Sequence, residues 1–237
     1  MAVEPRSHLV GDERNALLTS SSEPAGLPVR SCDRQAGSLH SRLRPSMTRK
    51  PLHGKSALTR LYRGVVQAGR PLVFLDFDDV ICLGDPYSGY DVFQPVSERP
   101  IDLWKKLWSN ESTTVLLSLA REFRPHLILT TSWIRLMERD GFVELFAATG
   151  LHELTPLLHP HWQTIQRPGT SRWSAIERWL AAHYEGQPVL ILDDWISGTG
   201  LADSPMYRID RVVLCQANVG LTHDHLPAIH KALSQPA

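Results

Sequence analysis

Residues 71–79 read PLVFLDFDD, an apolar run that ends in the acidic residues Asp76, Asp78 and Asp79. Its apolar residues are consecutive rather than alternating, which is typical of a strand with both faces covered. Such strands belong to parallel sheets that carry helices on each side. The stretch therefore predicts a buried parallel strand with carboxylates at its C-terminal end.

Three further apolar runs follow along the chain, with helix-like stretches between the runs. The runs are His126–Thr130, Pro188–Asp193 and Arg211–Cys215. The helical candidates are Ser97–Trp108, Thr113–Phe123 and Ser171–Tyr184. This alternation is the pattern of consecutive βαβ units. It predicts an α/β fold, a three-layer Rossmann-like parallel sheet with helices on both faces.

Charge divides the 237 residues into two segments. Residues 1–70 carry 12 basic and 5 acidic residues, whereas residues 71–237 carry 13 basic and 20 acidic residues. Residues 1–60 are rich in Ser, Arg, Pro and Gly and lack apolar periodicity, so we expect a disordered basic tail there. Residues 61–237 are expected to form one domain. Met47 lies just before that domain, which leaves open whether residues 1–46 belong to the expressed protein.

The cysteines and the hydropathy favour a cytoplasmic protein. Cys32, Cys82 and Cys215 are far apart and show no CxxC pairing, as expected for a reducing compartment. No uninterrupted apolar stretch reaches the roughly eighteen residues of a spanning helix, and the N-terminus lacks the apolar core of a signal peptide. We therefore expect neither a membrane span nor secretion.

Polar residues follow three of the predicted strands where each strand ends. They are Asp76, Asp78, Asp79, Thr130, Thr131, Ser132, Asp193 and Asp194. The carboxyl ends of parallel strands meet at one edge of the sheet, where ligands of such folds bind. Clustered carboxylates repel one another unless a cation neutralises them, and Mg²⁺ prefers oxygen ligands. The predicted metal ligands are Asp76, Asp78, Asp193 and Asp194.

Magnesium beside carboxylates indicates phosphoryl chemistry. Asp76 could attack phosphorus to form an aspartyl-phosphate, and Asp78 has the spacing of a general acid and base. Thr130, Thr131 and an arginine could bind the phosphoryl oxygens. Beyond Arg70 the only lysines are Lys105, Lys106 and Lys231, all outside the expected loop. Arg172, in the first turn of a predicted helix, is the preferred cation, and Arg167 is the second choice.

These residues resemble the four ordered motifs of the haloacid dehalogenase-like (HAD) superfamily. The matching stretches are Asp76-Phe77-Asp78-Asp79-Val80, Leu129-Thr130-Thr131, Arg172 and Leu192-Asp193-Asp194. Thr130-Thr131-Ser132-Trp133 and the late Gly220-Leu221-Thr222 are most similar to small HAD domains of RNA-repair proteins. The resemblance implies an Mg²⁺-dependent hydrolase in which Asp76 is the nucleophile, Asp78 the acid and base, and Asp193 and Asp194 hold the metal.

The resemblance also bears on reaction type and substrate. Dehalogenases of the superfamily generally lack an acid at the position of Asp78, so phosphatase is preferred. Short spacings between the motifs leave little room for a large cap domain, and members without one often act on macromolecules. The implied substrate is a nucleic-acid end or a phosphoprotein. Asp79 replaces a common glycine, which puts the flap geometry in doubt, and Ile134 separates Trp133 from Arg135 where the subgroup tends to carry Arg directly.

Four alternatives compete with this interpretation. A phosphoacceptor receiver domain also clusters acids at strand ends, but its motifs run in a different order. A small-molecule or nucleotide phosphatase, or a non-catalytic scaffold with the same fold, would share most of these residues. The histidine pairs His159 and His161, and His223 and His225, could bind zinc, although no third ligand stands at a matching spacing.

Overall fold

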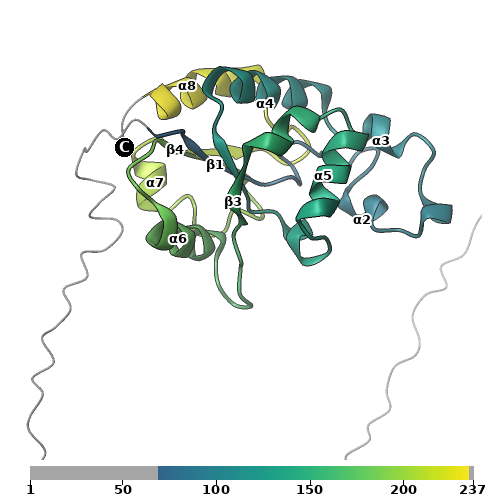
Figure 1. The fold of residues 1–237 in the computed structure, drawn as a ribbon, viewed down its shortest axis with the longest axis horizontal. Coiled ribbons are helices and arrows are strands. Elements are labelled where there is room, and N and C mark those ends of the chain that lie inside the picture. Colours follow the sequence, from purple (N-terminus) through teal and green to yellow (C-terminus); the bar gives the residue numbers. More distant parts are fainter. Residues whose placement is uncertain (1–68, 235–237) are drawn as a thin grey trace, which may run out of the picture. The chain divides into compact units, whose positions relative to one another are not determined.

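The computed structural model describes residues 69–234, whose core is a five-stranded parallel sheet (Figure 1). The strands are β1 (Leu72–Leu75), β2 (His126–Leu129), β3 (Leu158–Gln163), β4 (Val189–Asp194) and β5 (Val212–Cys215). Their order is β3-β2-β1-β4-β5, and each neighbouring pair is parallel. The predicted α/β fold is confirmed. The expected tail at residues 1–60 lies outside the described residues.

Seven α-helices and four 3₁₀ turns connect or flank the described strands. The helices are α2 (Gly89–Val92), α3 (Leu103–Lys106), α4 (Asn110–Phe123), α5 (Arg139–Ala148), α6 (Arg172–His183), α7 (Pro205–Arg208) and α8 (Leu226–Ser234). The 3₁₀ turns are η1 (Val96–Glu98), η2 (Ser132–Arg135), η3 (His152–Leu157) and η4 (His223–His225). The predicted helix Ser97–Trp108 is broken into η1 and α3. Arg99 is extended, with ψ 138°, because the following Pro100 disfavours helical backbone there.

Helices cover both faces of the sheet, which gives the three predicted layers (Figure 1). Val73 and Leu75 of β1 face a core that contains residues of α4, α5 and α8, whereas Leu72 and Phe74 face a second core with residues of α6 and α7. The chain builds β2 and β3 on one side of β1 and then crosses to build β4 and β5 on the other. Because such crossovers share one hand, the covering helices change face when the direction reverses. The reversal places β1 at the centre, between β2 and β4.

Strand β3 is missing from the sequence prediction, which places no strand between the runs His126–Thr130 and Pro188–Asp193. It contains His159, Pro160 and His161, and its polar residues mask any period-two pattern. Proline is tolerated at the edge of a sheet, where one side of the strand makes no ladder bonds. The edge position of β3 therefore permits its polar composition, which leaves no apolar run to mark it, whereas β5 at the opposite edge is apolar.

Two features of the described residues bear on the expected cellular location. Within residues 69–234 no helix combines the length and the apolar character that crossing a membrane would need. Cys82 and Cys215 are buried free thiols. Cys32 lies outside the described residues, and the cytoplasmic location stays a prediction.

Four histidines gather where β3 meets α6. The ring centroid of His159 is 5.1 Å from His126 and 5.0 Å from Trp179, and His161 stacks on His183 at 4.0 Å. Burial, followed by the neighbouring His126, lowers the pKa of His159 to about 4. Within the described chain, these rings do not form a group of three ligand atoms close enough to hold a metal. The geometry therefore does not support the zinc alternative.

We expect acid to destabilise the fold through this cluster. The folded state lowers the pKa of His159, so the unfolded chain binds protons at a higher pH than the folded chain. The free energy of unfolding should therefore fall as the pH drops from about 6.5 towards about 4. Urea denaturation at several pH values measures this fall. His159→Phe should reduce it, whereas the same change at the exposed His152 should not, and an equal pH dependence in all three proteins would contradict this assignment.

Candidate active site

The polar residues predicted at the strand ends lie together at the carboxyl edge of the sheet. Asp76 follows β1, Thr130 follows β2, and Asp193 and Asp194 end β4. Because β1 pairs with both β2 and β4, these three strand ends are neighbours. The strand order reverses at this point, which is where open α/β sheets bind ligands.

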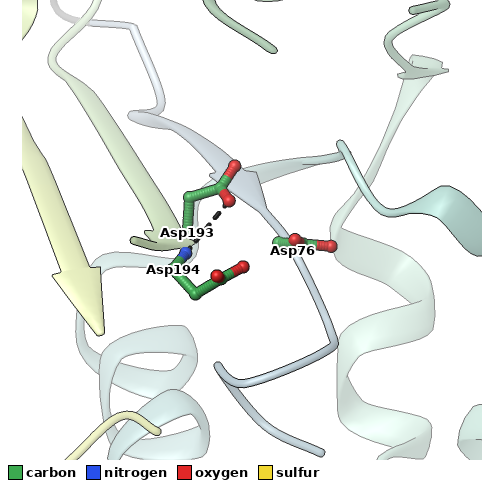
Figure 2. A group of neighbouring side chains, drawn as sticks. All are labelled: Asp76, Asp193 and Asp194. Carbon is green, nitrogen blue, oxygen red and sulfur yellow. Dashed lines mark hydrogen bonds between the residues drawn. The ribbon is translucent and has the colours of Figure 1, made fainter. Parts of the chain in front are cut away.

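Three carboxylates form the centre of the site (Figure 2). Asp76, Asp193 and Asp194 are buried, and one ligand oxygen from each lies within 4.8 Å of the others. In residues 69–234 this is the one group of His, Cys, Asp or Glu side chains with that geometry. Burial, together with the charge of Asp76, raises the pKa of Asp193 well above its usual range. The trio therefore needs positive charge to remain ionised.

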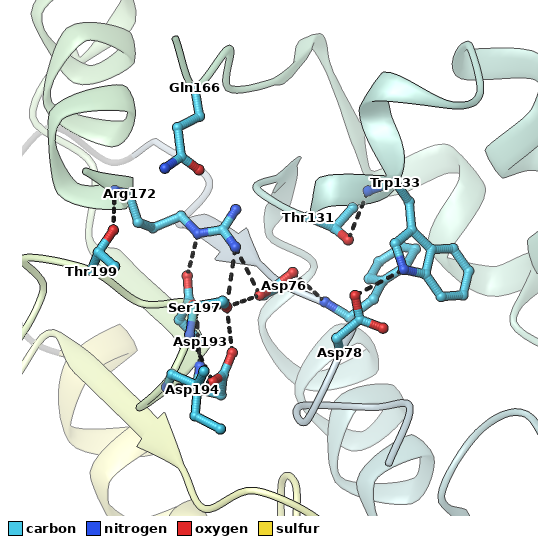
Figure 3. A network of polar contacts seen from close by, with 12 residues as sticks. Asp76, Asp78, Thr131, Trp133, Gln166, Arg172, Asp193, Asp194, Ser197 and Thr199 are labelled. Carbon is cyan, nitrogen blue, oxygen red and sulfur yellow. Dashed lines mark hydrogen bonds and ion pairs between the residues drawn. The ribbon is translucent and has the colours of Figure 1, made fainter. Parts of the chain in front are cut away.

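Arg172 supplies part of that charge from the first residue of α6 (Figure 3). Its Nη2 lies 2.9 Å from Oδ2 of Asp76, and its Nε lies 3.1 Å from Oδ2 of Asp193. The Ser171 hydroxyl caps α6, and the Arg172 backbone N–H donates to the Thr199 hydroxyl. These contacts fix the start of the helix, so the guanidinium is directed into the carboxylates.

Ser197 is a central polar residue of the site that the sequence analysis missed. Its hydroxyl lies 2.7 Å from Oδ2 of Asp76 and 3.1 Å from Oδ1 of Asp193, and it also contacts Asp194. The next residue, Gly198, allows this close approach, since a Cβ there would lie 2.4 Å from the backbone oxygen of Asp194. The hydroxyl four residues after Asp193, followed by glycine, is the signal that could have identified it.

Asp78 lies apart from the carboxylate trio, although it was expected among the metal ligands. Its Oδ2 accepts a hydrogen bond from Nε1 of Trp133 at 3.0 Å (Figure 3). Burial and the charge of Asp76 raise the pKa of Asp78 to about 6, while the Trp133 hydrogen bond opposes this rise. The indole thus holds the carboxyl in place and leaves it able to carry a proton near neutral pH.

The two threonines after β2 differ in their contacts. The Thr131 hydroxyl accepts from the backbone N–H of Trp133 and caps η2. The buried Thr130 hydroxyl has no hydrogen-bond partner among the described residues. Both line a cavity of about 220 Å³ that Arg172 also borders. Since buried hydroxyls are normally paired, Thr130 has an unused donor for a ligand in this cavity.

Asp79 occupies the turn where many HAD sequences have glycine. Its φ is +56°, in the left-handed region that favours glycine, although Asp tolerates it better than most residues. Its Oδ1 accepts from the backbone N–H of Asn218 at 2.7 Å, which ties the turn to the loop after β5. Asp79 therefore adopts the left-handed backbone that glycine favours, and its side chain is held by the loop after β5.

No large cap covers the site in the described part of the chain. Between β1 and α4 the structure places only α2, η1 and α3, and between β2 and β4 only η2, α5, η3, β3 and α6. Arg167, the second choice for the phosphate clamp, is exposed on the loop before α6, whereas Arg172 is buried against the acids. Arg172 is the better placed of the two.

One comparison with known families matches this region of the chain. The profile described as the HAD domain in Swiss Army Knife RNA repair proteins matches residues 72–226, more than half of the chain. That stretch contains every residue of the site described above and runs from the first strand to the start of α8. No curated protein and no solved structure shows a significant match.

Proposed function

The chain belongs to the family of HAD domains in Swiss Army Knife RNA repair proteins, and from this we propose that it is a magnesium-dependent phosphatase acting on the phosphorylated end of a nucleic acid. The observation that carries the proposal is the buried trio of Asp76, Asp193 and Asp194, with Arg172 on one side and Asp78 on the other. Together these residues place a candidate nucleophile, ligands for a cation and a carboxyl that can carry a proton at one site.

The donor set fits a hard divalent cation. Asp76, Asp193 and Asp194 offer only oxygen ligands, and their mutual repulsion is the reason for the raised pKa of Asp193 beyond burial itself. These three would hold Mg²⁺, which when bound would neutralise charge on the phosphoryl group. Asp78 is left out of this ligand set because its carboxyl pairs with Trp133.

Asp76 is proposed as the nucleophile. Its Oδ1 accepts from the backbone N–H of Phe77 at 2.8 Å, and Arg172 and Ser197 hold its Oδ2, so the carboxylate has a fixed orientation. Its attack forms a bond to phosphorus and breaks the bond to the alcohol oxygen. The product is an aspartyl-phosphate on Asp76, which water then hydrolyses.

Asp78 is proposed to move the proton in both steps. It would give its proton to the departing alkoxide and then take one from the water that attacks the aspartyl-phosphate. A raised pKa allows a carboxyl to act in both directions near neutral pH, and Trp133 orients it. Asp78 thus performs general acid and base catalysis in turn.

Thr130, Thr131 and Arg172 are proposed to bind the phosphoryl oxygens. The buried hydroxyl of Thr130 has no partner among residues 69–234, and Arg172 already lies within ion-pair distance of the nucleophile. A guanidinium can contact two oxygens of one phosphoryl group, which stabilises the charge that spreads over them. The absence of a large cap in the described residues, together with the family description, favours a macromolecular substrate over a small metabolite.

The proposal is tested by phosphate release from 4-nitrophenyl phosphate and from phosphate-terminated oligonucleotides. We expect turnover with Mg²⁺, loss of turnover with EDTA, and recovery when Mg²⁺ is restored in excess. Calorimetric titration with Mg²⁺ should give one site, which Asp194→Asn should weaken. Magnesium binding without turnover of any phosphate ester would contradict the proposal and favour the non-catalytic scaffold.

A further inference from the structure

A second hollow adjoins the cavity at the candidate phosphate site. The cavity beside Thr130 and Arg172 has a volume of about 220 Å³. A groove of about 420 Å³ lies between β3 and α6, and Gln163 and Ile165 line both. The two hollows are therefore neighbours, with Gln163 and Ile165 at their common boundary.

The near cavity has the character of a site for phosphate and polar groups. Arg135 and Gln166 line it together with Arg172, and Gln166 lies beside the Arg172 side chain (Figure 3). The amide nitrogen of Gln166 donates to the backbone oxygen of Thr170 at 2.8 Å, which orients this side chain. An exposed arginine next to the proposed phosphate binders can contact a second phosphate attached to the same substrate.

The groove offers aromatic surfaces. Trp179 and the stacked pair of His161 and His183 line it, with the two imidazoles 4.0 Å apart and inclined by only 18°. Thr164, which is 2% exposed, also lines the groove, and its buried hydroxyl has no partner among the described residues. Flat rings with an unpaired hydroxyl are the features that bind unstacked bases.

The charge around the two hollows favours an anionic ligand. Among residues 69–234 no Asp or Glu lines either hollow, although residues 71–237 carry 20 acidic and 13 basic residues. Arg172 and Arg135 border the near cavity, and Arg178 borders the groove. Arg178 also donates to the backbone oxygen of Ile165 at 3.1 Å, which ties α6 to the common boundary. Arginines near stacking surfaces suit a polynucleotide backbone with its bases.

We propose that the two hollows are consecutive subsites for a single-stranded nucleic acid whose terminal phosphate lies at Asp76. This inference rests on the proposed function and adds that the enzyme binds the nucleotides next to the scissile phosphate. The near cavity takes the phosphodiester next to the terminal nucleotide, and the groove takes bases further from the end. Ile165, whose side chain is 66% exposed, separates the two subsites with an apolar surface.

The experiment compares substrates of different length. Oligoribonucleotides of one, two and four nucleotides carry a terminal phosphate, at the 3′ end in one series and the 5′ end in another. In the better series, kcat/KM should rise at least about tenfold from one to four nucleotides, since stacking of one base contributes roughly that factor. Equal kcat/KM for oligoribonucleotides of all lengths would overturn the proposal. A higher kcat/KM for a phosphopeptide than for the tetranucleotide would also overturn it.

Variants separate the two subsites. Arg135→Gln should reduce the gain between one and two nucleotides, whereas Arg178→Gln should reduce the gain between two and four. His161→Ala tests the aromatic wall independently, because this side chain is exposed and its loss leaves the core unchanged. The matched control is Arg208→Gln in α7, an exposed arginine that lines neither hollow. An equal loss of length dependence in the control would overturn the proposal.

Failure of this inference can be told from failure of the proposed function. Turnover of 4-nitrophenyl phosphate, with equal kcat/KM for oligoribonucleotides of all lengths, would support the phosphatase activity and overturn the subsites. If no ester is hydrolysed, the proposed phosphatase activity is wrong. Fluorescence anisotropy of a labelled tetranucleotide then tests the subsites by binding alone. At least about tenfold weaker binding to Arg178→Gln than to Arg208→Gln would support them, and equal binding would overturn them.

Discussion

Replacement of Asp76 with Asn should lower the rate of phosphate release by at least about 10³-fold, because an amide cannot attack phosphorus as the carboxylate does. Asn has nearly the same shape as Asp, so the backbone after β1 should keep its course. The variant loses the ion pair with Arg172 but also removes a charge that repels Asp193. Because these two effects oppose each other, we expect the variant to remain folded, which near-ultraviolet circular dichroism will show.

Asp79→Asn is the matched control for this prediction. Asp79 lies three residues away, outside the carboxylate trio, and its left-handed backbone is one that Asn also tolerates. An amide oxygen at this position can still accept from the backbone N–H of Asn218. We expect a change of less than about threefold in phosphate release, since an exposed-loop contact is retained. Similar losses in both variants would show that the activity depends on the negative charge of this turn as a whole. That result would contradict the role of Asp76 as the nucleophile.

The fold could be predicted wherever burial shows in the sequence. Strands β1, β2, β4 and β5 are apolar runs because helices cover them, and four runs between helical stretches leave few alternatives to a parallel sheet. Strand β3 lies at the edge, where Pro160 and two histidines are tolerated, so no apolar run marks it. The prediction of one helix over Ser97–Trp108 is wrong for a local reason, because Pro100 divides a stretch whose spacing is otherwise helical.

The site could be predicted wherever a residue type at a strand end limits the chemistry. Asp76, Asp193 and Asp194 meet because β1 and β4 are adjacent and in register. The pairing of Asp78 with Trp133 could not be foreseen, because it depends on how η2 places the indole, 55 residues along the chain. Ser197 escaped notice for the same reason, since its role comes from the turn after β4 rather than from a strand end.

The choice between Arg172 and Arg167 depends on where helix α6 begins and on where the fold places that end of the helix. The sequence predicts a helix over Ser171–Tyr184 with Arg172 in its first turn, and in the structure Ser171 caps α6, so that Arg172 is the first residue of this helix. The fold directs that first turn towards the ends of β1 and β4, where the guanidinium meets Asp76 and Asp193. Arg167 lies outside the helix and stays exposed, so the two arginines give a sharp experimental contrast.

Arg172→Gln should lower the free energy of unfolding by about 3–5 kcal/mol in EDTA, because it leaves buried carboxylates without their compensating cation. The effect on catalysis should also be large, with kcat/KM for phosphate esters reduced at least about 10²-fold through loss of the contact to the phosphoryl oxygens. Arg167→Gln makes the same change at an exposed position and should alter stability by less than about 0.5 kcal/mol. Urea denaturation of the unmodified protein and the two variants measures the differences in stability, and phosphate release measures the differences in kcat/KM.

Magnesium should partly restore the stability of Arg172→Gln, and this distinguishes a metal site from a purely structural ion pair. A ligand that binds only the folded state stabilises it by RT ln(1 + L/Kd), where L is the free ligand concentration, so tighter binding at the same concentration gives a larger stabilisation. Without the guanidinium, the trio of Asp76, Asp193 and Asp194 keeps its negative charge, so we expect Mg²⁺ to raise the urea midpoint more in the variant than in the unmodified protein. If Mg²⁺ changes neither midpoint, the trio does not bind this cation, and Arg172 alone neutralises it. The combination of a large loss in EDTA and a recovery with Mg²⁺ is expected only if the arginine and the cation neutralise the same three carboxylates.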